Sequence, residues 1–167
     1  MSMMEPLATE LEQESATTRR HLERVPAGKL DWKPHPKSMS LGQLALHVAS
    51  TPGTIAGLLG ESEFDASQID FQPTTPESHA QIMQVFEETL VSTVETLNAM
   101  GDAEAMSLWT LRRGDAEFFT VPKIGLARTL LLNHLYHHRG QLTVYLRLLD
   151  VSVPSTFGPS ADENPFA

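Results

Sequence analysis

The sequence predicts an all-α fold: a four-helix bundle with crossover connections, a short hairpin insert before the last helix and an irregular C-terminal tail. Four long stretches carry hydrophobic residues at three-to-four spacing, which is typical of helices that bury one face. They cover residues 4–25, 41–60, 76–100 and 122–149. Two of the connections are long enough to cross over the bundle rather than form tight turns between neighbouring helices. The 167 residues fit a single domain, 1–167, that can bury a real core.

Composition narrows the function classes. Hydrophobic residues make up 41% and charged residues 20% of the chain, which is typical of a globular protein. The net charge of −9 disfavours nucleic-acid binding, which needs a basic face. The chain has no cysteine, so disulfides, thiolate ligands and a protein thiol nucleophile are excluded. The N-terminus lacks the apolar core of a signal peptide, and no apolar run approaches the ~18 residues of a membrane span. We therefore expect a cytoplasmic protein with no membrane partner.

The first helix is predicted over residues 4–25, with a hydrophobic stripe on one side and charges mostly on the other. Pro26 ends it, and the connector that follows contains Pro34 and Pro36, so it must be extended. Trp32 is expected to anchor this connector on the bundle. The charged residues of the first helix are expected to form a solvated face: Glu10, Glu12, Glu14, Arg19 and Arg20.

The second helix is predicted to begin after Ser40, because Ser40 and Gln43 match the S-x-x-Q capping box before an apolar run. Pro52 should kink this helix or break its hydrogen bonding locally, since proline has no N–H to donate. His47 lies at the edge of the apolar stripe. Taken alone, a histidine in that position is more often a packed or surface residue than a metal ligand.

The segments on either side of the third helix contain turn signals. Residues 61–75 have no helical period and are predicted to form a loop. Thr75 is the expected cap of the third helix, with Pro76 at its first position. Residues 105–121 break the helical rhythm, and hydrophobic residues there flank an Arg-Gly-Asp triplet. This pattern predicts a short hairpin with a glycine turn.

The last predicted helix, residues 122–149, organises the fold. His134 and His138 are four residues apart, so both imidazoles project from nearly the same side, one turn apart. They can bind one divalent ion, or they can be core histidines that hydrogen-bond within the bundle. If the second and fourth helices are neighbours, His47 can complete a tripod with an open coordination position, which is typical of catalytic sites. Three nitrogen ligands suit Zn²⁺ or Ni²⁺.

Other polar residues of this helix have competing interpretations. His137 points about 100° around the helix from His138, so it is expected to face a neighbouring helix or solvent. Gln141 lies two turns after His134 and can hydrogen-bond a ligand histidine, orient metal-bound water or fill the core. It is the one candidate for a catalytic role. Arg139 can hold an anionic substrate group, but a structural ion pair is the commoner role for such a residue.

Three segments resemble the DinB-like (DinB/YfiT) superfamily of bacterial metal-binding four-helix bundles. The second of them contains the family's H-x-x-x-H-R-G-Q pattern, and with the helix order the resemblance spans nearly the whole chain. It implies metal ligands at His47, His134 and His138, and a homodimer formed through helix faces. The segments are WKPHPKSMSLGQLALHV at residues 32–48, HLYHHRGQLTVYLR at 134–147 and VPSTFGPSADE at 153–163.

The resemblance also implies a reaction class, because some relatives are transferases or isomerases that depend on a low-molecular-weight thiol. The expected function is a metal-dependent hydrolase or thiol transferase acting on a small-molecule substrate. In the second case the thiol must arrive with the cosubstrate, since the chain has no cysteine. The alternative is a non-catalytic bundle in which the ion stabilises the fold or senses metal status. DNA binding is a third interpretation, which the net charge disfavours.

Overall fold

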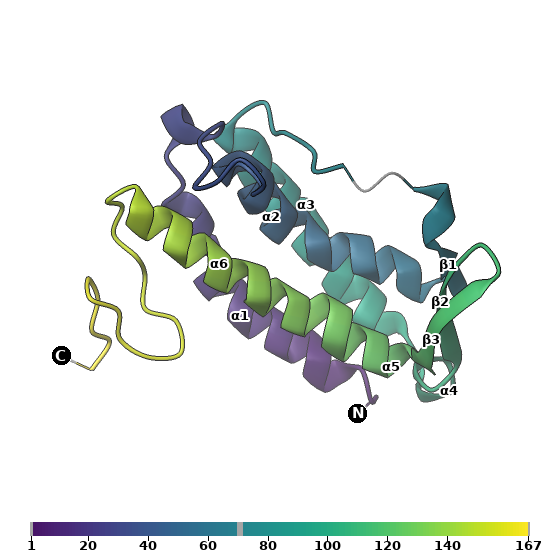
Figure 1. The fold of residues 1–167 in the computed structure, drawn as a ribbon. Coiled ribbons are helices and arrows are strands. Elements are labelled where there is room, and N and C mark those ends of the chain that lie inside the picture. The colour runs from purple at the N-terminus through teal and green to yellow at the C-terminus, as the bar shows by residue number, and fades with distance from the viewer. Residues whose placement is uncertain (1, 70–71, 167) are drawn as a thin grey trace.

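The computed structural model describes residues 2–69 and 72–166 of the chain. The protein is mostly helical, with a small three-stranded sheet at one end (Figure 1). The long helices are α1 (Glu5–Glu23), α2 (Leu41–Leu59), α3 (His79–Ala99) and α6 (His134–Leu148). The shorter elements are α4 (Asp102–Ala105), α5 (Lys123–Leu126), strands β1 (Glu63–Asp65), β2 (Leu108–Arg113) and β3 (Ala116–Pro122), and 3₁₀ turns at Ala27–Lys29 and Ala66–Gln68.

The helices α3 and α6 lie between α1 and α2. The helix α2 packs against both α3 and α6, and α1 packs against the same two helices. Figure 1 shows α2 and α6 running alongside each other. The second and last predicted helices are therefore neighbours, which is the condition for a site shared between them.

Leucine is the commonest residue of the buried core. The helix α2 buries residues on most of its circumference, because it lies against two other helices. Each buried leucine removes hydrocarbon from water and contributes about 1.5–3 kcal/mol. This packing holds α2 and α6 in a fixed register. The buried leucines of these two helices are Leu41, Leu44, Leu46 and Leu59 on α2, and Leu135, Leu142 and Leu146 on α6.

The helix α2 begins where the capping box predicted. The Ser40 hydroxyl accepts a hydrogen bond from the Gln43 amide at 3.2 Å, and Gln43 Oε1 accepts one from the Ser40 amide at 2.9 Å. The helix runs on through Pro52, so the proline does not end it. The Thr89 hydroxyl on α3 donates to the Ala49 carbonyl at 2.7 Å, which ties α3 to the backbone of α2 just before the proline.

The connector between α1 and α2 is anchored on α6, as predicted. The Trp32 ring meets the Tyr145 ring edge to face, with centroids 5.8 Å apart. The Tyr145 hydroxyl also donates to the Met39 carbonyl at 3.2 Å. These contacts fix the segment that leads into α2.

The helix α3 begins later than predicted. Its cap is Ser78, whose hydroxyl accepts a hydrogen bond from the Gln81 amide at 3.2 Å. The prediction of Thr75 as the cap and Pro76 as the first helical residue was therefore wrong. Threonine and serine are both good caps, but the Thr75 hydroxyl instead accepts a hydrogen bond from Gln43 Nε2 at 3.1 Å. That contact holds Thr75 against α2 and outside α3.

Of the predicted helix of residues 122–149, the structure is helical from Lys123 to Leu148 but not α-helical throughout, and Pro122 ends strand β3 instead of starting the helix. A π-helical segment, Ala127–Asn133, joins α5 to α6. The His134 amide donates to the carbonyl of Thr129, five residues back, and also to that of Leu131. Segments with this wider hydrogen-bonding pattern are rare and occur often at functional sites. Here the segment ends at one of the predicted metal ligands.

The sheet contains the predicted hairpin and one strand that was not predicted. The strands β2 and β3 pair antiparallel, and their turn contains Gly114 at φ 57°, a conformation that glycine adopts without steric cost. The strand β1 pairs with β2 in parallel. The loop prediction for residues 61–75 was therefore wrong for Glu63–Asp65. A strand this short shows too few alternations to be detected from sequence.

Most charged side chains of α1 that were predicted to be solvated form ion pairs with other elements. Their partners come from α3, the π-helical segment, α6 and the tail, so these side chains connect α1 to the rest of the protein. The solvated-face interpretation was wrong for Glu14, whose partner is the buried Arg139, whereas the side chains of Glu10, Arg19 and Arg20 stay partly exposed in their pairs. The pairs are Glu10–Arg128, Glu14–Arg139, Arg19–Glu87 and Arg20–Glu163.

The C-terminal tail is irregular, as predicted, and two carboxylates hold it in place. Asp162 accepts a hydrogen bond from the Val153 amide at 2.7 Å, and Glu163 accepts one from the Ser155 amide at 3.0 Å. Glu163 also pairs with Arg24 at 3.0 Å. The tail is thereby fastened to the end of α1.

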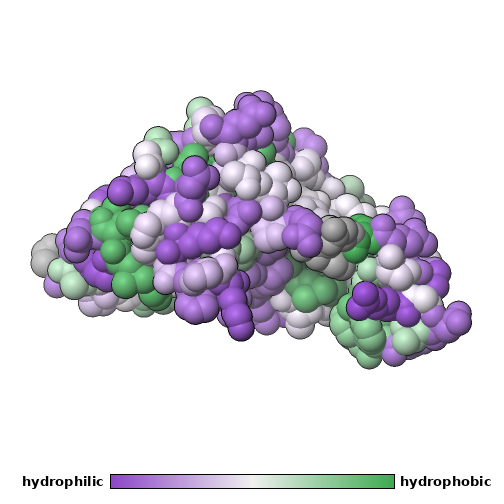
Figure 2. Space-filling model, turned by 45° about the horizontal axis from the view of Figure 1, so that its top comes forward, coloured by the Kyte–Doolittle hydropathy of each residue, from purple (hydrophilic) through white to green (hydrophobic). Residues whose placement is uncertain are grey.

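The surface is mostly hydrophilic on the face drawn in Figure 2, with hydrophobic patches toward both ends of the molecule. Exposed hydrophobic residues of the sheet include Leu108 and Phe118. Across residues 2–69 and 72–166, no helix combines the length and hydrophobicity that a membrane crossing requires.

Candidate metal centre

Three histidines from two helices meet between α2 and α6. The ring centroids of His47 and His134 are 5.2 Å apart, and the His138 centroid is 4.4 Å from each of the other two. One ring nitrogen from each residue lies within 4.8 Å of the others. The structure thus brings together the three residues that the sequence predicted as ligands, although His47 and His134 are 87 positions apart in the chain.

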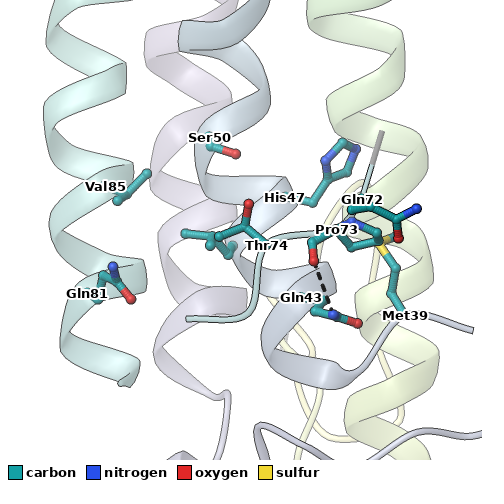
Figure 3. Close-up of a pocket in the computed structure, with 10 residues that line it drawn as sticks. Met39, Gln43, His47, Ser50, Gln72, Pro73, Thr74, Gln81 and Val85 are labelled. Carbon is teal, nitrogen blue, oxygen red and sulfur yellow. Dashed lines mark hydrogen bonds between the residues drawn. The ribbon is translucent and has the colours of Figure 1, made fainter. Parts of the chain in front are cut away.

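The two histidines of α6 direct the same nitrogen toward the centre. His134 Nε2 and His138 Nε2 are 2.7 Å apart. Their four-residue spacing puts both rings on one side of the helix, one turn apart. His47 projects from α2 toward α6 (Figure 3), so the third imidazole approaches this pair from the neighbouring helix.

Gln141 fixes the orientation of His138. Gln141 Oε1 lies 2.8 Å from His138 Nδ1, at hydrogen-bond distance. An amide oxygen can only accept, so His138 carries its proton on Nδ1 and presents the Nε2 lone pair to the centre. Of the three roles considered for Gln141, the structure shows the contact with a histidine. Such outer contacts orient metal-bound histidines and set their tautomer.

The His134 ring is placed by the π-helical segment. Its Nδ1 is buried, and no group in the described ranges forms a hydrogen bond with it. The His134 amide donates to the carbonyls of Thr129 and Leu131. The Leu130 carbonyl therefore does not accept the hydrogen bond that the His134 amide would give it in a regular α-helix. The backbone of Leu130 acts to raise the pKa of His134, against the larger effect of burial.

All three imidazoles are held in the neutral form. Burial lowers the pKa of His47, with the neighbouring His134 acting in the same direction. Burial also lowers the pKa of His134. Burial lowers the pKa of His138 to about 4, against the opposing effect of the Gln141 hydrogen bond. Neutral imidazole is the form that binds a metal ion, so no proton has to leave these ligands at neutral pH.

This donor set fits a divalent ion of the zinc or nickel type. Zinc binds imidazole nitrogen at about 2.0–2.1 Å, which places two ligand nitrogens of a tetrahedral centre about 3.3 Å apart. Small ring rotations at His134 and His138 would supply that separation. With an ion on both Nε2 atoms, the proton of His134 would lie on its buried Nδ1, facing the Leu130 carbonyl. Three ligands leave at least one coordination position open.

A pocket of about 530 Å³ borders His47 on the side of α3. Its walls come from α2, from α3 and from residues 72–74, which pass across its front in Figure 3. Gln43 Nε2 donates to the Pro73 carbonyl at 3.2 Å, which holds this segment against α2. A volume of this size is typical of sites for small organic ligands. Sequence analysis did not identify the pocket, because its walls come from segments with no shared motif.

Arg139 and His137, which flank His138 in the sequence, contact residues outside the cluster or face solvent. Arg139 is 1% exposed, and its guanidinium pairs with Glu14 at 2.7 Å and donates to the Thr18 hydroxyl at 3.1 Å. The structural ion pair that was the favoured interpretation of Arg139 is confirmed. His137 is exposed, as expected, and its ring also touches His138, with centroids 4.9 Å apart.

The fold and this cluster define a class: a mainly helical protein with a three-histidine cluster, shared between two helices, that could hold a metal ion. A sequence profile of the DinB family matches residues 1–164. The chain belongs to the DinB family.

Solved structures support the same fold. The crystal structure of a DinB-like protein from Bacillus cereus is similar to this chain, with a TM-score of 0.68 and 24% identity, over 90% of this chain and 95% of that one. A DinB-like protein from Bacillus subtilis also has a TM-score of 0.68, with 18% identity, over 90% of this chain and 96% of its own. At 24% and 18% identity, the similarity to these two structures shows a shared fold and no more. None of the curated proteins compared with this chain is similar enough to count as a match.

Proposed function

We propose that this protein is a metal-dependent enzyme in which His47, His134 and His138 hold one divalent ion, Zn²⁺ or Ni²⁺, with open coordination. The observation that carries the proposal is the convergence of three neutral imidazoles, with ligand nitrogens within 4.8 Å of one another, from two separate helices. The reaction that best suits such a centre is hydrolysis or transfer of a low-molecular-weight thiol to a small-molecule substrate.

Each residue has a defined part in this proposal. A bound ion would supply Lewis acidity and lower the pKa of a coordinated water or thiol. The three histidines bind it through uncharged nitrogens, so its positive charge is not neutralised by the ligands. Gln141 keeps His138 in the tautomer that presents Nε2. In the transferase reaction the thiol comes from a cosubstrate, because the chain has no cysteine.

Metal analysis tests the site directly. Protein purified without a histidine tag should contain about one zinc or nickel ion per chain, and His134→Ala should contain almost none. The matched control is His35→Ala, which removes an exposed histidine outside the cluster and should keep the ion. Full occupancy in His134→Ala would remove the ligand assignment.

An activity screen separates the two reaction classes. The metal-loaded protein should consume an electrophile only when a small thiol is supplied, or it should hydrolyse an ester or amide with the metal alone. Chelation should abolish either activity, and restoring the ion should recover it.

A structural role for the ion is the second candidate, because the cluster joins α2 to α6. In that case the binding free energy of the ion would contribute to folding. Chelation would then lower the melting temperature while the thiol and hydrolase screens stay silent.

We also propose that the helical part is a four-helix bundle with crossover connections in one domain, 1–167, and that two copies form a homodimer. Exposed Val144 and Leu148 on α6 offer an apolar surface for such an interface. Light scattering coupled to size-exclusion chromatography should then give twice the chain mass. Replacement of Val144 by Glu should shift the protein to the monomer.

A further inference from the structure

The pocket beside His47 is chemically distinctive. Apolar side chains line much of it, including Met39 before α2, Leu46 on α2 and Val85 on α3. The polar residues in its lining carry amide or hydroxyl groups. Within the described part of the chain, His47 is the only residue with a titratable side chain in the lining.

Two hydrogen-bond donors of the pocket have no acceptor among the described residues. Gln81 Oε1 accepts a hydrogen bond from the Glu77 amide at 2.7 Å, which fixes the amide group and leaves its NH₂ for another partner. Figure 3 shows the Gln81 side chain extending from α3 on one side of the pocket, with Ser50 on the α2 side. Among residues 2–69 and 72–166, no acceptor binds Gln81 Nε2 or the Ser50 hydroxyl.

This lining selects against charge. An anion that enters the pocket loses part of its hydration and finds no lysine or arginine in the described lining to pair with. An uncharged molecule loses little hydration, gains apolar contact, and can offer polar atoms to the donors of Gln81 and Ser50. Arg139, the cation nearest in sequence to the histidines, is bound to Glu14 and is not in this lining.

We propose that this pocket binds the uncharged, largely apolar part of the substrate, and that a carbonyl or ether oxygen of that molecule accepts a hydrogen bond from Ser50, while Gln81 can donate to a second polar atom. The assignment of the occupant as substrate rests on the proposed function, because the pocket adjoins the metal centre only through His47. The site thereby separates two tasks. The histidines serve the ion, and the α2–α3 side holds the organic group that reacts.

A matched pair of fluorescent probes tests this assignment on the zinc-loaded protein. One probe is prodan, an uncharged naphthalene ketone whose emission shifts to the blue in an apolar site. The other is the corresponding naphthalene carboxylate, in which a carboxylate replaces the ketone. We expect prodan to bind with a blue shift and at least about tenfold more tightly than the carboxylate, because the anion has no partner in the lining.

Two variants on one helix locate the binding. Ser50→Phe fills the pocket and should reduce prodan affinity at least about tenfold, which corresponds to ~1.4 kcal/mol. Thr54→Phe adds the same ring one turn later on α2, at an exposed position outside the lining, and should leave affinity unchanged. Circular dichroism and zinc content should match between the two variants. If Ser50→Phe loses its fold, Ser50→Val, which removes the donor, should still weaken prodan binding several-fold.

The outcomes for the pocket and for the metal site are distinct. Equal binding of both probes, or prodan binding that neither Ser50 variant changes, overturns the pocket assignment while leaving the metal centre intact. The natural protein could instead bind prodan at Ser50 and take up no ion, just as His134→Ala does. That result overturns the proposed function and the substrate role together. It would leave only a binding site for neutral molecules.

Discussion

A Cβ atom added to Gly53 would lie 2.8 Å from Cγ2 and 2.9 Å from Cβ of Thr89. The helices α2 and α3 therefore cross at a point with no room for a side chain on α2. The same threonine donates its hydroxyl to the Ala49 carbonyl at 2.7 Å. This crossing fixes the part of α2 that follows His47.

Gly53→Ala should destabilise the protein by about 1–3 kcal/mol, because the added methyl group forces the two helices apart. The matched control is Gly57→Ala, one turn later on the same helix, where an added Cβ meets nothing within 4 Å. That change should stabilise the helix by about 0.5–1 kcal/mol. Urea denaturation measures both effects. Equal stability of the two variants would show that the crossing is not close-packed in solution.

Gln141→Leu should weaken metal binding by about 10–100-fold, because it removes the acceptor that holds His138 Nδ1. Gln141→Glu keeps an oxygen acceptor at the same position and should bind the ion at least as tightly as the natural protein. Competition with a chromophoric chelator measures the two affinities. A leucine variant with unchanged affinity would exclude a role for Gln141 in orienting the ligand.

The unfolding free energy of the metal-free protein should fall as the pH is lowered from about 6.5, the ordinary pKa of histidine. His21 is fully buried, and burial lowers its pKa in the folded protein. Below pH 6.5 the unfolded chain therefore binds a proton that the folded protein does not. This proton binding stabilises the unfolded chain and lowers the free energy of unfolding. The histidines of the cluster act in the same direction. The loss continues until the folded-state pKa values are passed.

His21→Asn isolates the contribution of that residue. The variant should show a shallower decline of stability with falling pH, with the difference confined to the region below about pH 6.5. Denaturant titrations at several pH values, in the presence of a chelator, provide the measurement. Parallel curves for the variant and the natural protein would contradict a buried, neutral His21.

Glu14→Gln should destabilise the protein by about 2–4 kcal/mol, because it leaves the buried guanidinium of Arg139 without a countercharge. The control is Glu87→Gln, which breaks the pair with Arg19 on the surface and should cost about 1 kcal/mol or less. Thermal or chemical denaturation distinguishes the two. Similar losses from both variants would mean that Arg139 is solvated in the folded protein.

The parts of this protein that sequence predicted best are those with a local physical signal. Ser40 and Gln43 satisfy each other within one turn, so the start of α2 could be located from four residues. His134 and His138 are close because of helical geometry alone. His47 could be added because its helix was expected to lie beside theirs, and the family resemblance pointed to the same three residues.

The parts that were missed depend on contacts between distant segments. The choice of Ser78 over Thr75 as a cap depends on a hydrogen bond from Gln43 on another helix. The strand β1 exists because it pairs with β2, more than forty residues later in the chain. Glu14 was assigned to a solvated face because its partner, Arg139, could not be identified from spacing. The hydrogen-bonding pattern of the π-helical segment likewise leaves no signature in hydrophobic periodicity.

The π-helical segment before His134 has a consequence for how this helix tolerates changes in length. A π turn closes one residue later than an α turn, so deletion of one residue between Ala127 and Asn133 can be absorbed by a return to regular α geometry. The same deletion between His134 and His138 would rotate one imidazole away from the other by about 100°. Related chains could therefore gain or lose a residue ahead of the cluster while both imidazoles stay on the same side of the helix. The π-helical segment thus allows a change of length without moving the histidines relative to each other.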